Sequence, residues 1–263
     1  MKVLILASGT GGHLFPAQQL AFDLQEKGCS IFFAGYQLNK KPFFEKKSFP
    51  FYEIPSSPLK KNVIFFFFKI LRGFFKSLKM LFKEKPDVVI SFGSFHTFPP
   101  LIAAKCLRKK IIIFEPNVVL GKVNRIFSKK STVCTQFPIG FHTVKPLPWR
   151  VRDEKIDGNL DPKVFTFLIF GGSQGALFLN DLFLKSIPYL KKMFSFQVIH
   201  ITGLHADPQK IKKHYQNIKS YVVSFVKNMT PFYKISDLAV CRAGSSTIAE
   251  LIHFGIPSVL IVD

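Results

Sequence analysis

Short apolar segments alternate with segments of helical periodicity along most of the chain. The first apolar segment, residues 2–7, precedes a glycine-rich turn and then apolar residues at helical spacing: Leu14, Ala17, Leu20, Ala21 and Leu24. Further segments of strand length follow at 30–34, 51–54, 87–91, 110–114 and 131–135, the last strand expected in this half. Continuous apolar runs of this length are typical of buried parallel strands. The alternation therefore predicts a parallel sheet with helices on both faces.

The same organisation begins again after a segment of different character. Residues 143–163 are rich in proline and charge and lack periodicity, which indicates a linker. An apolar strand at 164–170, a second glycine turn at 171–175 and a helix from 176 to about 191 follow, with later strands at 197–201, 221–225, 238–241 and 257–263. We predict two doubly wound α/β domains, 1–145 and 164–263, joined by a linker at 146–163. Because a final buried strand leaves its crossover uncovered, the second domain is expected to be incomplete.

The segment 63–82 carries two parallel stripes. Basic residues recur every three or four positions, as do apolar ones: Lys69, Arg72, Lys76, Lys79 and Lys83 in one stripe, and Phe65, Phe68, Leu71, Phe75, Leu78 and Phe82 in the other. One interpretation is a helix packed on the sheet with a solvated basic face. The other is a basic amphipathic helix that seeks a membrane surface, because the run 64–68 is wider than one buried face requires.

Composition narrows the possible partners. The net charge is +21, from 37 Lys and Arg against 16 Asp and Glu, which suits a nucleic acid or an anionic membrane. The aromatic residues cluster in apolar runs and are not interleaved as base-stacking platforms, so no specific nucleic-acid binding is expected. The four cysteines are far apart, which favours neither zinc nor disulfides and fits a reducing cytosol. No apolar run is long enough to span a bilayer.

The first glycine turn, residues 7–16, is the strongest chemical signal. Its three glycines let backbone N–H groups approach a phosphate or sugar, and the helix N-terminus favours negative charge. A tight turn without a ligand is the alternative. A dinucleotide-binding turn is disfavoured because Leu14 replaces the third glycine and no acid follows the second strand before Glu45. His13 places an ionisable side chain at the mouth of this turn.

Three other positions are candidates for a ligand site. Glu115 and Asn117 follow a strand end, where open α/β sheets bind ligands. Ser and Thr at 245–247 open a helix whose N–H groups are suited to a diphosphate, and Glu250 lies one turn on, where a carboxylate can accept both ribose hydroxyls. The alternative for Glu250 is ordinary favourable charge near a helix start. The role of Arg150 in the linker stays open on spacing alone.

Together these motifs resemble the MurG family of peptidoglycan N-acetylglucosaminyltransferases. The matching segments, in chain order, are 9–13 with Phe15-Pro16, Phe92-Gly93, Glu115 with Asn117, Pro148 with Arg150, 171–176, 225–229 and 242–250. The resemblance implies two Rossmann-like domains facing across a cleft (the GT-B fold). It also implies transfer of N-acetylglucosamine from UDP-N-acetylglucosamine to lipid I, giving lipid II, with inversion of the anomeric centre and no bound metal or other cofactor.

The resemblance also implies a role for individual residues. His13 would be the general base, a role for which histidine as a residue type is suited. The donor would be bound by Thr10, Gly11, Gly12, Asn117, Arg150, Ser173, Val226, Ser245, Ser246, Thr247, Ile248, Ala249 and Glu250. Two departures stand out: Phe114 and Pro116 replace the family's His and Gln, and the family's later donor-binding glutamine segment is missing.

The acceptor implied by the resemblance carries a polyprenyl chain that cannot leave the bilayer. We therefore expect the first domain to bind an anionic membrane through Phe65, Phe68, Lys69, Arg72, Lys76 and Lys79, as a peripheral protein on the cytoplasmic face of the bacterial inner membrane. Two alternatives remain from the residues alone. One is a two-domain transferase for another nucleotide sugar, and the other is an inactive basic membrane-binding module.

Overall fold

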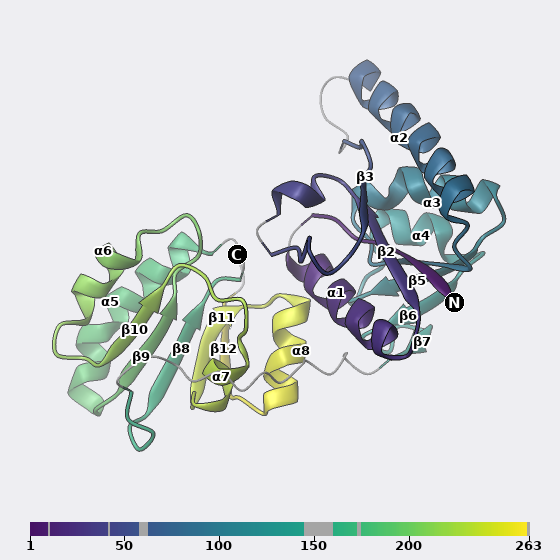
Figure 1. Ribbon diagram of the computed structural model, residues 1–263. Helices are drawn as coiled ribbons and strands as arrows, with labels where there is room; N and C mark the ends of the chain where they lie inside the picture. The colour runs from purple at the N-terminus through teal and green to yellow at the C-terminus, as the bar shows by residue number, and fades with distance from the viewer. Residues whose placement is uncertain (10, 42, 58–62, 145–159, 173–174, 262–263) are drawn as a thin grey trace. The chain divides into compact units, whose positions relative to one another are not determined.

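The chain separates into two compact units, shown in Figure 1. This computed structural model describes residues 1–9, 11–41, 43–57, 63–144, 160–172 and 175–261. Contacts divide it into unit 1, Met1–Pro148, and unit 2, Trp149–Asp263. The predicted linker falls largely on residues 145–159, outside the described residues.

Unit 1 is built on a parallel sheet, with seven strands in the described residues. The strands are β1 (Lys2–Leu6), β2 (Ser30–Gly35), β3 (Phe51–Glu53), β4 (Val88–Ser91), β5 (Lys110–Glu115), β6 (Thr132–Thr135) and β7 (His142–Thr143). Their order is β3-β2-β1-β4-β5-β6-β7, and each pairing is parallel. The expectation that β6 is the last strand of this half is wrong, because the two residues of β7 extend the edge; so short a strand has no detectable sequence pattern.

Helices cover both faces of this sheet (Figure 1). They are α1 (Gly11–Glu26), α2 (Val63–Glu84), α3 (Phe98–Cys106) and α4 (Lys122–Ser128), with 3₁₀ turns at Leu38–Lys40 and Phe95–Thr97. Leu4 and Leu6 of β1 pack with α2, α3 and α4 in one core cluster. Strand side chains alternate between faces, so Val3 and Ile5 point to the other face. Phe33 of β2, the register partner of Ile5, packs there against Phe44 and Phe49, and Phe49 contacts Phe22 of α1.

Unit 2 repeats the plan with five parallel strands in the described residues. These are β8 (Thr166–Phe170), β9 (Gln197–Ile201), β10 (Ser220–Val223), β11 (Leu238–Arg242) and β12 (Ser258–Ile261), in the order β10-β9-β8-β11-β12. Alternate residues of β8 enter two separate clusters. Leu168 and Phe170 face α7 (Thr230–Lys234) and α8 (Ser245–Phe254), whereas Phe167 and Ile169 face α5 (Leu177–Met193) and α6 (Pro208–Lys212). A 3₁₀ turn follows α6 at Lys213–Tyr215.

Helix α2 presents three different faces. The face that packs on α3 and the sheet carries Gly73 and Ser77, both buried, and then Met80 and Leu81 of the core. A Cβ at Gly73 would lie 2.1 Å from the carbonyl oxygen of Pro55, so only glycine allows the helix to approach this closely. Successive residues of an α-helix are about 100° apart, so the positions beside this packed face turn outward.

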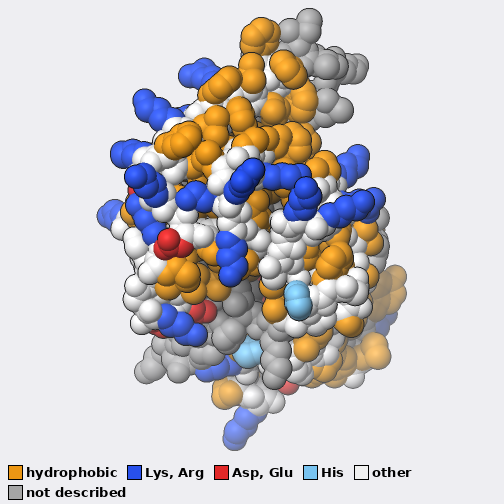
Figure 2. All heavy atoms as spheres, turned by 90° about the vertical axis from the view of Figure 1, so that its right-hand side faces the viewer, with side chains coloured by type: hydrophobic (Ala, Val, Ile, Leu, Met, Phe, Trp, Pro, Cys, Tyr) orange, Lys and Arg blue, Asp and Glu red, His pale blue; other side chains and the backbone are white. Residues whose placement is uncertain are grey.

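The outward faces of α2 are one apolar and one basic. The exposed apolar side chains are Phe67, Phe68, Leu71, Phe75 and Phe82, and the exposed cations beside them are Arg72, Lys76, Lys79 and Lys83. Figure 2 shows hydrophobic side chains gathered over this helix with Lys and Arg along their border. The interpretation that the apolar stripe packs on the sheet is therefore wrong for Phe68, Leu71, Phe75 and Phe82. The expected exposure is confirmed for Phe67 and Phe68, while the Phe65 side chain lies outside the described residues.

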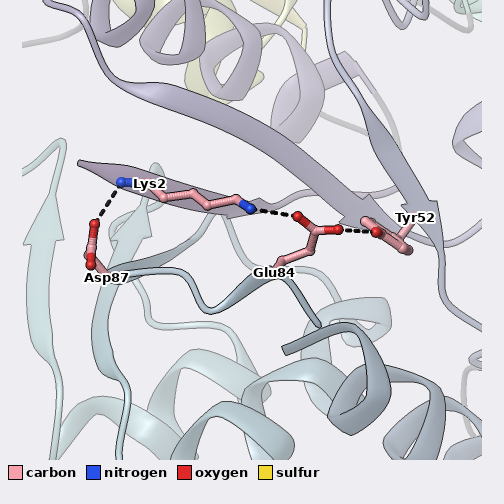
Figure 3. A network of polar contacts seen from close by, with 4 residues as sticks. All are labelled: Lys2, Tyr52, Glu84 and Asp87. Atoms are coloured by element: carbon pink, nitrogen blue, oxygen red, sulfur yellow. Dashed lines mark hydrogen bonds and ion pairs between the residues drawn. The ribbon is translucent and has the colours of Figure 1, made fainter. Parts of the chain in front are cut away.

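The C-terminal end of α2 is tied to the sheet by a polar network (Figure 3). The Lys2 ammonium donates to Glu84 at 2.6 Å, and the Tyr52 hydroxyl donates to the other oxygen of the same carboxylate. The backbone N–H of Lys2 donates to Asp87 at 2.7 Å. The bonds from Lys2 and Tyr52 lower the pKa of Glu84, and the bond to Glu84 raises the pKa of Tyr52 to about 12. Glu84 thus joins the last turn of α2 to strands β1 and β3.

Candidate functional site

Several predicted site residues lie where the strand order reverses, whereas Asn117 follows β5 and Val226 follows β10. In the sheet of unit 1, β1 lies between β2 and β4. In the sheet of unit 2, β8 lies between β9 and β11. In open α/β sheets such switch points leave a crevice outside the carboxyl ends of the strands. The turns after β1 and β4, and those after β8 and β11, lie at these points.

The turn after β1 holds His13 in a defined orientation. Gly9 has φ +96°, a conformation that favours glycine, and α1 begins at Gly11. His13 is half-buried, and its Nδ1 lies 2.8 Å from the carbonyl oxygen of Phe92, at the end of β4. A carbonyl oxygen only accepts, so Nδ1 carries the proton in the neutral ring and Nε2 carries the lone pair. His13 is thus fixed in the tautomer that a general base at Nε2 requires.

The turn after β4 brings a second histidine to this end of the sheet. Gly93 and Ser94 both have positive φ, 80° and 78°, and the Ser94 hydroxyl accepts from the His96 N–H at 3.4 Å. The His96 ring stacks on Tyr36 at 4.7 Å and its Nδ1 is hydrogen-bonded to the buried Ser56 hydroxyl. Burial, and then the charge of Lys41, lower the pKa of His96. Sequence reasoning missed His96, because no spacing links it to Tyr36 and Ser56.

Glu115 organises the loop after β5. It is buried, and its carboxylate accepts from four donors: the N–H and the side-chain amide of Asn117, the N–H of Gly121 and the side-chain amide of Asn124. The Asn117 side chain is exposed beyond this carboxylate, which holds it in place. Phe114, at the position where the resembling family has histidine, packs against Phe92 with ring centroids 5.3 Å apart.

Asn124 is a further residue that the sequence analysis missed. Its side-chain amide donates to Glu115 at 2.8 Å, and its Oδ1 is the buried side-chain polar atom without a partner among the described residues. It lies on the inner face of α4 between Val123 and Phe127, both buried. A polar residue on an apolar helix face was the signal that was available.

The turn after β8 is packed tightly enough to require its glycines. A Cβ at Gly171 would lie 2.3 Å from the N of Ala176, and one at Gly175 would lie 2.6 Å from the Cα of Gly203. Gly175 also donates to the carbonyl of Gly172 at 2.9 Å. The turn is thereby fixed on the strand β9 side before α5 begins at Leu177. Ser173 lies outside the described residues, as do Thr10 and Arg150.

Helix α8 carries six of the predicted donor-binding residues, 245–250. It starts at Ser245, directly after Gly244, so the N–H groups of its first turn face the end of β11. Ser245, Ser246, Thr247 and Ile248 are half-buried in this turn and Ala249 is buried. Glu250, one turn on, accepts a hydrogen bond from the buried Tyr233 hydroxyl of α7. Val226, after β10, packs against the core cluster that contains Tyr233.

In the part of the chain that the structure describes, His, Cys, Asp and Glu form no group of three or more that is suited to a metal ion. His13, the predicted base, and Glu250, the predicted ribose acceptor, are hydrogen-bonded to a carbonyl and to a hydroxyl.

Two comparisons of domains agree with this arrangement. Residues 3–135 match the glycosyltransferase family 28 N-terminal domain, and residues 166–263 match the glycosyltransferase family 28 C-terminal domain. Solved glycosyltransferases of low sequence identity share the fold. The structure of SsfS6, a glycosyltransferase of Streptomyces sp. SF2575, has a TM-score of 0.65 at 15% identity, and the match covers 100% of this chain and 82% of that one. The two family matches, on two parallel-sheet units, therefore define a hexosyltransferase of the GT-B class.

More similar relatives narrow this class. The UDP-N-acetylglucosamine–N-acetylmuramyl-(pentapeptide) pyrophosphoryl-undecaprenol N-acetylglucosamine transferase of Protochlamydia amoebophila is 38% identical, over 99% of this chain and 75% of its own length. The enzyme of the same name from Rickettsia canadensis is 31% identical, over 99% and 78%. The crystal structure of Acinetobacter baumannii MurG has a TM-score of 0.74 at 27% identity, over 99% and 78%. The chain belongs to the MurG family.

Proposed function

We propose that this protein transfers N-acetylglucosamine from UDP-N-acetylglucosamine to a polyprenyl-diphosphate-linked N-acetylmuramyl acceptor (lipid I), forming lipid II for peptidoglycan. The observation that carries the proposal is 38% identity, across 99% of the chain, to an enzyme named for this reaction.

The proposed base is Nε2 of His13. The acceptor sugar's hydroxyl oxygen attacks the anomeric carbon of N-acetylglucosamine from the side opposite the UDP. The new carbon–oxygen bond forms as the bond to the diphosphate oxygen breaks, so the anomeric centre inverts. The hydroxyl proton passes to Nε2, which is free to accept it because Nδ1 faces the carbonyl of Phe92 at 2.8 Å.

The leaving UDP gains negative charge, which α8 is suited to stabilise. Backbone N–H groups at a helix N-terminus and the helix dipole both favour a phosphate there. We propose that residues 245–249 bind the diphosphate, that Glu250 accepts the ribose hydroxyls and that Val226 lies beside the uracil. Thr10, Gly11, Gly12, Asn117, Arg150 and Ser173 remain proposed contacts of the donor. This scheme uses no bound metal, so we expect activity to survive excess EDTA.

The acceptor's polyprenyl chain requires the enzyme to work at a membrane. None of the described helices is both long enough and apolar enough to cross one. We propose peripheral binding to the cytoplasmic face of the inner membrane through α2. Its support is the exposed apolar face of Phe67, Phe68, Leu71, Phe75 and Phe82 beside a basic face, a pattern that soluble surfaces usually avoid.

The decisive experiment is UDP release measured with UDP-N-acetylglucosamine and a lipid I analogue. We expect UDP to appear only when both substrates are present, together with a disaccharide-linked lipid identified by mass spectrometry. UDP-glucose and UDP-N-acetylgalactosamine serve as competing donors. Turnover with one of these in preference to UDP-N-acetylglucosamine would establish a different transferase, and hydrolysis without transfer to the lipid would contradict the proposal.

A further inference from the structure

Tyr233 and Glu250 form a pair whose geometry is fixed within unit 2. Tyr233 comes from α7 and is 2% exposed, and its hydroxyl donates to Oε2 of Glu250 on α8. The Tyr233 ring stacks on Phe254 with centroids 5.1 Å apart and meets the edge of Phe170 at 6.0 Å. Because two aromatic rings hold its plane, the hydroxyl has one direction in which to donate.

The surroundings of the pair decide its charge. Burial raises the pKa of Glu250 to about 7, and the hydrogen bond from Tyr233 opposes that shift because it stabilises the ionised carboxylate. Burial and the charge of Glu250 keep the pKa of Tyr233 well above its ordinary value, so its hydroxyl stays a donor. The Cys241 thiol of β11 also stays neutral, with a pKa of about 12. Arg242 and His253 are exposed at the end of β11 and on the last turn of α8.

A carboxylate and a carboxylic acid treat a ribose differently. The two adjacent hydroxyls of a ribose donate two hydrogen bonds, which an ionised carboxylate accepts with its free lone pairs. Tyr233 occupies one acceptor position on Oε2 and leaves Oε1 for the sugar. A protonated Glu250 would itself become a donor and would lose part of this acceptor capacity.

We propose that Tyr233 is a positioning residue that keeps the Glu250 carboxylate ionised and aimed at the ribose of the nucleotide. The proposal rests on the proposed function, which places the ribose at Glu250. It adds a testable property: the preference for a ribonucleotide over its 2′-deoxy analogue depends on pH, and the Tyr233 hydroxyl sets the pH at which that preference is lost.

The experiment measures the binding of UDP and 2′-deoxy-UDP to the full chain by calorimetry between pH 6 and pH 9. For the unmodified protein we expect UDP to bind about 10- to 100-fold more tightly than 2′-deoxy-UDP at pH 8 to 9, the range expected for a hydrogen bond to a charged group. This preference should fall as the pH drops through about 7, where Glu250 gains its proton.

The test variant is Tyr233→Phe, which removes only the hydroxyl. Without its hydrogen bond the pKa of Glu250 rises further, so the preference should be weak at pH 7 and should return at pH 9. Tyr221→Phe is the control, because Tyr221 packs against the core cluster that contains Tyr233 and the change is chemically identical. The control should keep the profile of the unmodified protein. Glu250→Gln should lose the pH dependence altogether.

Three results would overturn the proposal. Equal weakening of UDP and 2′-deoxy-UDP by Tyr233→Phe at every pH would mean a merely structural role, and an unchanged profile would mean no role. If Tyr233→Phe does not fold, the profile of the unmodified protein still decides, because a preference that does not vary with pH contradicts the coupling. Absence of any UDP binding would contradict the proposed function as well, whereas a failure confined to Tyr233→Phe would leave that function standing.

Discussion

The exposed apolar face of α2 gives the most quantitative prediction. Phe68 and Phe75 are 65% and 59% exposed and lie on the same side of the helix, seven residues apart. A phenylalanine buries about 150–250 Å², so each leaves about 100–150 Å² in water. At about 25 cal/mol per Å², full transfer to lipid is worth about 3 kcal/mol for each ring. An amphipathic helix sinks only part of this area into the interface, so about half of that value is realistic.

The corresponding experiment is the double variant Phe68→Ser/Phe75→Ser in vesicle co-sedimentation. A loss of about 3 kcal/mol corresponds to about a 100-fold weaker partition, on neutral and anionic vesicles alike. Replacing Arg72, Lys76 and Lys79 by Gln should instead weaken binding to anionic vesicles alone, at about 1 kcal/mol for each charge. Both variants should melt at the temperature of the unmodified protein, because the changed side chains lie outside the core.

Phe178→Ser is the matched control. Phe178 lies on α5 in unit 2 and is 63% exposed, so the chemical change and its exposure are the same, while the helix is different. We expect it to leave vesicle binding unchanged. If Phe68→Ser/Phe75→Ser binds vesicles as tightly as the unmodified protein, the argument that α2 contacts the membrane is wrong.

Three further predictions concern single polar residues. His13→Ala should lower turnover about 100- to 10,000-fold while UDP binding persists, and near-normal turnover would remove His13 from the mechanism. Burial lowers the pKa of His200 from 6.5 to about 4, so the unfolded chain binds a proton that the folded chain refuses. Between pH 6.5 and pH 4, urea titrations should show that the unmodified protein loses up to about 3 kcal/mol of stability relative to His200→Gln. Glu84→Gln should bring the pKa of Tyr52 from about 12 toward 10, which a difference ultraviolet titration can follow, and an unchanged Tyr52 titration would contradict the network of Figure 3.

The regular elements were predictable from the sequence because buried parallel strands have a strong signal. Continuous apolar runs such as 111–114 predict a strand covered on both faces, and each predicted strand has a counterpart in the sheets. The second glycine turn was predictable for a different reason: Gly171 and Gly175 occupy points where any Cβ would collide with backbone, so the turn requires glycine. Backbone constraints of this kind are local and so appear in local sequence.

The orientation of α2 and the polar networks were not predictable from local sequence. An apolar stripe normally marks the buried face of a helix, but α2 packs through Gly73 and Ser77, since small residues allow closer approach. The partners of Tyr233 and Asn124 come from elements 17 and 9 residues away, and nothing in the spacing links them. Such contacts depend on how the elements pack, so single-sequence patterns do not carry them.

The network at Glu84 has a consequence for catalysis at a membrane. Lys2, at the beginning of β1, holds the last turn of α2, and the turn that carries His13 follows the other end of the same strand. Five extended residues span about 16 Å, so a short rigid strand sets the separation between the α2 anchor and the glycine turn. If α2 lies on the bilayer, the height of His13 above the lipid is fixed by unit 1 alone. The proposed base, His13, would then stay at a constant distance from the membrane that holds the lipid acceptor, because α2 and the His13 turn are both attached to β1.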